Sequence, residues 1–144
     1  MAEIRRTIEF KAPIDRVWSY LTTPDKIAQW MMPNTFEPVH GRAFTMECPP
    51  GIGSGAPVEC VVTELAAPKD SRARLAYSWA IDRPPLITML TIHLVEQGGV
   101  TTMDLVHSGW EELGPDDAYV RDRHEQGWDH LLGTLLRPLV EGSD

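Results

Sequence analysis

The sequence predicts an α+β fold that consists of a curved antiparallel sheet, two short helices and one long C-terminal helix. The long helix packs on the concave face of the sheet. Three observations predict this fold. Leucines recur on one helical face near the C-terminus, turn signals recur at hairpin spacing between residues 35 and 110, and no helical period interrupts that stretch. The 144 residues are 42% hydrophobic and 24% charged, so we expect residues 1–144 to form a single domain.

The N-terminal segment predicts one strand followed by two short helices. Residues 3–11 alternate between apolar and polar side chains in the way of a half-buried strand. Pro13 is suited to the first position of a helix, and residues 22–25 end that helix because the residue before Pro24 avoids helical dihedrals. A second short helix ends at Pro33. The side chains expected to face inward from the two helices are Val17, Trp18, Leu21, Ile27, Trp30 and Met31.

The middle of the chain predicts six consecutive strands. We expect them at residues 36–39, 43–48, 58–65, 74–81, 86–96 and 100–109. Short turns at 40–42, 83–85 and 97–99 separate some of them, and Gly98-Gly99 is a strong hairpin signal. Residues 49–55, rich in proline and glycine, predict a mobile loop. Consecutive hairpins form a meander, and its twist makes the sheet concave.

Residues 116–140 predict the long helix. The apolar face consists of Trp128, Leu131, Leu132, Leu135, Leu136 and Leu139. The opposite face carries charged residues that can stay in water. A helix of about 25 residues is roughly 37 Å long, enough to cross a small domain. Pro138 cannot donate to the carbonyl of Thr134, so we expect a kink near residues 134–138.

Several motifs, taken in order, resemble the START-like (SRPBCC) superfamily with the helix-grip fold, which includes the birch-pollen allergen. Within it, the chain is most similar to the branch of activator-of-heat-shock-protein-90-ATPase homologues. The matching residues are Lys11-Ala12-Pro13 with Val17-Trp18, Leu75-Ala76-Tyr77-Ser78-Trp79, Gly98-Gly99, Thr101-Thr102-Met103-Asp104-Leu105, His107-Ser108-Gly109-Trp110, and Gly127-Trp128 with Leu131, Leu132 and Leu135. The resemblance implies a pocket for apolar small molecules between the helix and the sheet, but no one reaction.

Composition excludes several function classes. A net charge of −8 opposes nonspecific nucleic-acid binding, which needs a basic surface. No apolar run is long enough for a membrane-spanning helix, and the N-terminus lacks an apolar signal core, so we expect no membrane insertion and a cytoplasmic location. Cys48 and Cys60 are too few for a disulfide scaffold and are expected to be reduced core thiols.

Two histidines are the candidate catalytic residues. His107 shares an inward strand face with Met103 and Leu105, where a neutral imidazole can act as a base or bond a ligand. The alternative is a buried histidine tied to a backbone group or to a helix side chain. His124 lies one turn before Trp128 and faces the sheet or the mouth of the pocket. No HxxxH spacing is present, so we expect no metal site and no cofactor.

The expected ligand pocket has a volume of roughly 300–1,000 Å³, the usual range for small-molecule sites. Its mouth should lie near residues 49–55 or the second short helix. For any one aromatic residue, simple core filling is the alternative use. The candidate ligand-binding residues are Trp30, Met31, Met46, Tyr77, Trp79, Met103, His107, Trp110, His124, Trp128 and Leu131.

Three functions compete at this point. The first is a soluble binding protein for a small hydrophobic or aromatic molecule, with no chemistry of its own. The second is a cyclase or hydratase type of enzyme that uses His107, with His124 or Tyr77, in the same pocket. The third is an adaptor that binds a chaperone, as the branch name suggests, although fold alone does not fix function. A homodimer is a further assembly that the sequence leaves open.

Overall fold

A computed structural model describes residues 2–48, 55–82 and 84–142 of the chain. In that part of the chain, the strands form one antiparallel sheet in the order β1-β6-β5-β4-β3-β2. The elements are β1 (Ile4–Phe10), α1 (Ile14–Thr22), α2 (Pro24–Trp30), β2 (Ala43–Met46), β3 (Val58–Lys69), β4 (Arg72–Asp82), β5 (Pro85–Gln97), β6 (Val100–Ser108), two 3₁₀ turns η1 (Trp110–Glu112) and η2 (Pro115–Asp117), and the helical segments α3 (Ala118–Asp129), η3 (His130–Leu136) and α4 (Arg137–Glu141).

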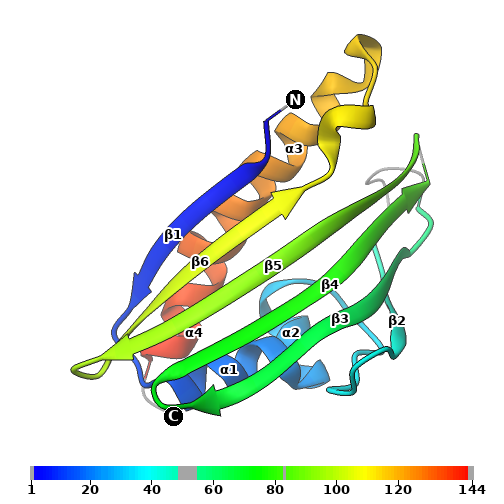
Figure 1. The fold of residues 1–144 in the computed structure, drawn as a ribbon. Coiled ribbons are helices and arrows are strands. Elements are labelled where there is room, and N and C mark those ends of the chain that lie inside the picture. The colour runs from blue at the N-terminus through cyan, green and yellow to red at the C-terminus, as the bar shows by residue number, and fades with distance from the viewer. Residues whose placement is uncertain (1, 49–54, 83, 143–144) are drawn as a thin grey trace.

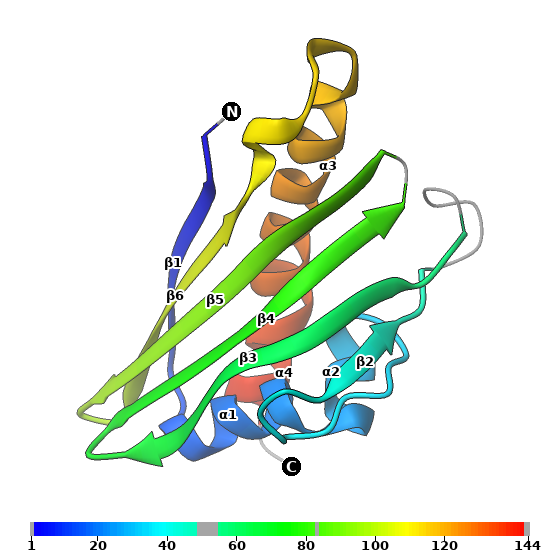
Figure 2. The same ribbon diagram turned by 45° about the vertical axis from the view of Figure 1, so that its right-hand side comes forward.

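The predicted architecture is confirmed. The C-terminal helical segments follow one another without a break and cross the concave side of the curved sheet (Figures 1 and 2). The buried side chains of the sheet and of this helix form one core, which includes Leu75, Leu90, Leu105, Leu132 and Leu136. The helix therefore covers the apolar face that the strand alternation predicts.

One predicted strand is wrong. Residues 36–39 lie in a loop, and Asn34 makes only an isolated bridge to Met46. The Asn34 side-chain oxygen accepts the N–H of Phe36 at 3.1 Å, so a side chain takes a backbone donor that a ladder would use. Pro38 has no N–H to offer a neighbouring strand. The segment therefore cannot continue as a strand.

Strand β3 is longer than predicted and continues to Lys69 rather than ending near Leu65. Pro68 is accommodated because the pairing with β4 shifts register between Ala66 and Lys69, and an irregularity in the ladder is where a strand tolerates proline. The predicted turn at Gly98-Gly99 is confirmed, with φ values of +60° and +79° that suit the tight turn of a two-residue hairpin.

The free edge of β1 is covered by side chains of the C-terminal helix. Arg121 donates to the carbonyl oxygens of Ala2 and Glu3 near one end of the strand. Toward the other end, Arg137 donates to the carbonyl of Glu9, and the Glu141 carboxylate accepts the N–H of Lys11. Between these contacts, Arg6 bonds the Asp129 carboxylate. Strand β1 and the helix thus run side by side, and the covered edge is protected from pairing with another chain.

Helices α1 and α2 close the end of the sheet where the C-terminal helix ends (Figure 2). The Glu96 carboxylate accepts the N–H of Ile14 at 2.6 Å and so satisfies a free donor at the start of α1. Arg16 of α1 donates to the carbonyl oxygens of Leu139 and Val140 at the end of α4. These bonds fix α1 to the sheet and to the long helix, and α2 follows directly after α1.

The long helix is π-helical over η3, just before Pro138. The N–H of Arg137 donates to the carbonyl of Leu132, five residues back. A wider turn of this kind is one way to place a proline, which lacks an N–H and crowds the preceding turn. The predicted irregularity near residues 134–138 is therefore a change of hydrogen-bond pattern, and it begins earlier, at His130.

Gly109 ends β6 and directs the chain into η1. Its φ is +101°, and a Cβ placed on it would lie 3.2 Å from the Cα of Thr88 on the neighbouring strand. Only glycine combines that conformation with that close approach without strain.

We therefore expect Gly109→Ala to lower the free energy of unfolding by about 1–3 kcal/mol, the usual cost of a strained backbone position. Urea unfolding followed by circular dichroism measures the change. Gly114→Ala is the matched control, because a Cβ at Gly114 meets no atom within 4 Å and its φ is −72°. Equal stabilities of the two variants would contradict this account of Gly109.

Candidate functional site

Five aromatic and imidazole side chains meet where the long helix crosses the sheet. We call Trp79, His107, Trp110, His124 and Trp128 the Trp/His cluster. They come from β4, β6, η1 and α3, and the two imidazole rings lie 5.6 Å apart between centroids. The centroid of the His107 ring also lies 4.7 Å from that of the Trp110 ring and 5.9 Å from that of the Trp79 ring. The cluster is therefore a continuous contact between the sheet and the helix.

His107 is fully buried, and both of its ring nitrogens are hydrogen-bonded. The indole N–H of Trp128 donates to Nδ1 at 3.1 Å. The other nitrogen, Nε2, lies 2.7 Å from the hydroxyl oxygen of Thr88. That hydroxyl also lies 2.8 Å from the carbonyl oxygen of Trp79, to which it donates. Because an indole can only donate, Nδ1 must accept, and the proton of the neutral ring lies on Nε2.

His124 repeats this arrangement with the nitrogens exchanged. The indole N–H of Trp79 points to Nε2 at 3.3 Å, so Nε2 accepts. The Nδ1 atom lies 2.8 Å from the carbonyl oxygen of Val120 and donates to it. Each tryptophan therefore assigns one tautomer to one histidine, and the two histidines have opposite tautomers.

Burial agrees with these neutral states. Burial, and to a smaller extent the neighbouring His124, lower the pKa of His107 to about 3. Burial also lowers the pKa of His124, against the opposing effect of the Val120 carbonyl. A protonated ring would point an N–H at an indole N–H in either case. At neutral pH both histidines are acceptors for tryptophan and have no lone pair left for a reacting group.

Trp110 completes the cluster from the side of η1. Its indole N–H donates to the carbonyl of His107 at 3.0 Å, and its ring lies 4.9 Å from that of His124. The conformation of Gly109 makes this possible, because it turns the chain back over the end of β6. Trp110 is fully buried and covers both imidazoles.

The structure brings the predicted site residues together only in part. Trp30, Met46, Tyr77 and Met103 are buried, whereas Met31 and Leu131 are half-buried. The indole of Trp30 donates to the carbonyl of Tyr20, at the helical end of the molecule. The hydrogen bond from Trp128 matches the alternative in which His107 is tied to a helix side chain. A role of any of these residues in catalysis or ligand binding stays a prediction.

Two residues that matter here were not predicted from the sequence. The Thr88 hydroxyl is hydrogen-bonded to His107. In the sequence, Thr88 is a polar residue in the inward phase of β5, which continues with Leu90, Ile92 and Leu94. Arg6 lies on the inward phase of β1 and bonds Asp129 at the edge of the sheet.

The cysteines are not activated. Burial raises the pKa of the Cys60 thiol to about 12 and also raises that of Cys48. Within the described ranges, no group of three or more His, Cys, Asp or Glu side chains is placed to hold a metal ion. The described helices include none long and apolar enough to cross a membrane.

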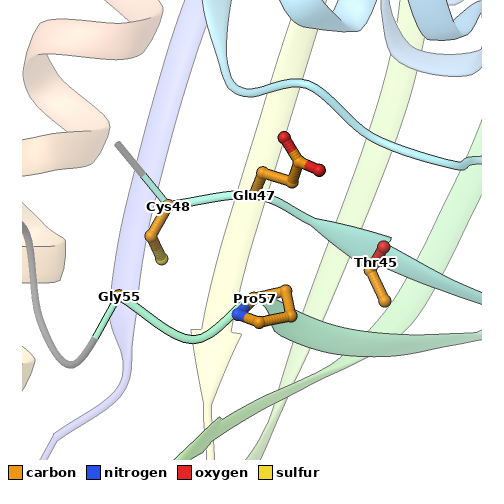
Figure 3. Close-up of a pocket in the computed structure, with 5 residues that line it drawn as sticks. All are labelled: Thr45, Glu47, Cys48, Gly55 and Pro57. Carbon is orange, nitrogen blue, oxygen red and sulfur yellow. The ribbon is translucent and has the colours of Figure 1, made fainter. Parts of the chain in front are cut away.

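A hollow of about 320 Å³ lies beside the end of β2 and the start of β3 (Figure 3). Thr45, Glu47, Cys48, Gly55 and Pro57 line it. Its lining is mostly polar and contains none of the candidate ligand-binding residues. It is distinct from the Trp/His cluster. The predicted mobile loop and pocket mouth at residues 49–55 stay a prediction, because residues 49–54 lie outside the described part of the chain.

Comparison with known proteins gives one family and several structures of the same fold. Residues 11–141 match the family described as Activator of Hsp90 ATPase homolog 1-like protein, which confirms the resemblance seen in the motifs. No curated protein matches the sequence. A crystal structure of a Mesorhizobium loti protein is similar with 22% identity and a TM-score of 0.83, over 99% of each chain.

Two further solved structures are similar over almost their whole length. A Bacillus halodurans protein, solved in solution, has 30% identity and a TM-score of 0.76, with 98% of each chain covered. The Aha1 dimer from Colwellia psychrerythraea has 21% identity and a TM-score of 0.74, over 99% of this chain and 98% of that one. They support the same fold of a sheet and a long helix.

The neutral state of His107 predicts a pH dependence of stability. The unfolded chain takes up a proton at this residue near pH 6.5, whereas the folded chain does so only near pH 3. Stability must therefore fall as the pH is lowered through that range, by roughly 2 kcal/mol at pH 5 for this residue. Urea unfolding at pH 7 and pH 5 measures the loss.

Glu125 and Asp129 also have lowered pKa values, through hydrogen bonds from Arg121 and Arg6. Their contributions to stability are lost mainly below their ordinary pKa values of 4.5 and 3.8. The loss between pH 6.5 and pH 5 therefore reports on the histidines. His107→Gln should reduce it, and His130→Gln, which removes an exposed ring, should retain it. The same loss in both variants would show that His107 is not held neutral.

Proposed function

The chain belongs to the family of Activator of Hsp90 ATPase homolog 1-like proteins, and on that premise we propose that it binds a small hydrophobic or aromatic molecule between the C-terminal helix and the sheet. One observation carries the proposal. The imidazole and indole nitrogens of the Trp/His cluster bond one another, the Thr88 hydroxyl or the backbone, so the side chains offer apolar surfaces and ring faces to a ligand.

The opening is expected between α2 and the π-helical segment, which are in contact. Met31 and Met32 follow α2, and Leu131 and Leu135 lie in the π-helical segment. All four are half-buried and pack against the core. The methionine side chains are flexible, and the π-helical turn beside them has an altered hydrogen-bond pattern. Both features suit a surface that adjusts its shape to a ligand.

An enzyme of the cyclase or hydratase type is less well supported. General acid–base catalysis needs a group that can exchange a proton with the substrate. His107 and His124 are both neutral acceptors for an indole N–H, and protonation would break that bond. A reaction through them would first require the cluster to open.

An adaptor that binds a chaperone is the other reading, and it rests on the family name. It calls for an apolar patch on the surface. The exposed large apolar side chains of the described residues include Val39, Val61, Ile87 and Tyr119, which lie in a loop, on β3, on β5 and at the start of α3. They come from separate elements, so binding of a small molecule remains the better-supported function.

Titration with Nile red, a neutral apolar dye, tests the proposal. We expect saturable binding at one site per chain, a blue shift of the dye emission, and quenching of tryptophan fluorescence by energy transfer to the bound dye. Leu131→Gln should weaken binding about tenfold or more, since burial of a leucine side chain contributes roughly 1.5–3 kcal/mol. Leu139→Gln, on α4, is the matched control and should bind as the wild type does.

Two outcomes would contradict the proposal. The first is the absence of saturable dye binding by a folded protein. The second is an equal loss of affinity in the Leu131 and Leu139 variants, which would show that the dye does not bind at the opening beside Leu131.

A further inference from the structure

The hydroxyl of Tyr77 has no partner within the part of the chain that the structure describes. No hydrogen bond joins it to any of those residues. The buried threonine hydroxyls, by contrast, are bonded: that of Thr88 donates to Trp79, and that of Thr101 donates to the carbonyl of Ala12. The residue itself is only 4% exposed. An interior hydroxyl without a partner requires a physical reason.

The position of Tyr77 is central. It lies in β4 opposite Val62 of β3 and Leu90 of β5, and Leu90 in turn pairs with His107. It is two residues before Trp79 in the same strand, so both side chains lie on the inward face. Tyr77 is therefore the neighbour of Trp79, a member of the Trp/His cluster, on the inward face of β4.

Aromatic rings cover the other side of Tyr77. Phe44 of β2 meets its ring edge-on at 5.1 Å between centroids, and Phe36 lies at 6.5 Å. These two phenyl rings contact each other at 5.0 Å. The ring of Tyr77 is thus packed against aromatic side chains that carry no hydrogen-bond acceptor.

The hydroxyl must nevertheless border open space. Among the described residues, every side-chain nitrogen or oxygen that is sealed from solvent has a hydrogen-bond partner. Since the Tyr77 oxygen has none, it is not sealed, and a water molecule or another small molecule can touch it. A polar group of this kind inside an apolar wall is the usual means of orienting a ligand.

We infer that the Tyr77 hydroxyl is the polar contact for the molecule bound inside the protein, and that this molecule is a neutral hydrophobic compound with an acceptor oxygen such as a carbonyl. The inference rests on the proposed binding function and adds the chemical class of the ligand. It also moves the polar contact from His107, whose nitrogens are occupied, to the middle of β4.

The surroundings of the hydroxyl favour a neutral ligand. Burial, and to a smaller extent the nearby Cys60, raise the pKa of Tyr77, so the group is a donor at every physiological pH. Cys60 is itself held in the neutral thiol form. A carboxylate bound beside them would be desolvated without a cation to compensate it, which costs several kcal/mol. A ketone, quinone, ester or amide oxygen avoids that cost.

A matched pair of probes tests the inference: 2-acetylnaphthalene, which carries a ketone, and 2-ethylnaphthalene, which does not. Isothermal titration calorimetry on the wild type should show tighter binding of the ketone, by about three- to tenfold, the value of one net hydrogen bond. Tyr77→Phe should remove this preference and leave the affinity for 2-ethylnaphthalene unchanged. The infrared carbonyl band of the bound ketone should lie at lower frequency in the wild type than in the variant.

Tyr20→Phe is the matched control. Tyr20 is also a buried tyrosine whose hydroxyl has no hydrogen bond to the described residues, but its ring lies under the side chains of Arg16 on α1 and Lys26 on α2. This variant should keep the preference for the ketone and the position of the carbonyl band.

The outcomes separate the two proposals. If the wild type binds both probes and Tyr77→Phe keeps the ketone preference, or if the wild type has no such preference, the role of Tyr77 is refuted while the binding function stands. If neither probe binds to the folded wild type, both fall. If Tyr77→Phe weakens both probes equally, Tyr77 contributes only to packing, and the inferred hydrogen bond is refuted.

Discussion

Two hydrogen bonds from tryptophan to histidine hold the long helix to the sheet, and much of the interior depends on them. Trp128 of α3 donates to His107 of β6, and Trp79 of β4 donates to His124 of α3. The donor of the first bond belongs to the helix, and the donor of the second belongs to the sheet. Buried polar groups of this kind stabilise a fold only when each has its partner, and a single missing partner costs about 1–3 kcal/mol. The pair therefore fixes how the helix lies across the strands.

The same bonds limit what the interior can do. Because both histidines are acceptors, the site cannot lend a proton without opening, and its walls are aromatic and aliphatic. The Tyr77 hydroxyl differs from these imidazoles, because it is a donor without a partner among the described residues. An interior that satisfies its own imidazoles and leaves the Tyr77 hydroxyl available is, in our proposal, better suited to holding a neutral molecule than to transforming it. In the same proposal, the half-buried methionines after α2 lie beside the entry.

Much of the fold could be predicted from the sequence, because it depends on local periodicity. The leucine face between residues 131 and 139 determines a helix, Gly98-Gly99 determines a hairpin, and the strand phase places His107 inward. Residues 36–39 resembled a strand because nothing local shows that the Asn34 side chain takes the N–H of Phe36. Thr88 could not be found because a threonine suits either face of a strand. Its bond to His107 depends on the register of β5 against β6 and on the turn at Gly109.

The tautomers of the two histidines test the central claim most directly. Long-range ¹H–¹⁵N correlation spectra of the protein at pH 7 distinguish a protonated ring nitrogen from one that accepts a hydrogen bond. The hydrogen-bond pattern predicts a proton on Nε2 of His107 and on Nδ1 of His124, with both rings neutral. A positively charged ring, or a proton on Nδ1 of His107, would contradict the account, because Trp128 would then have no acceptor.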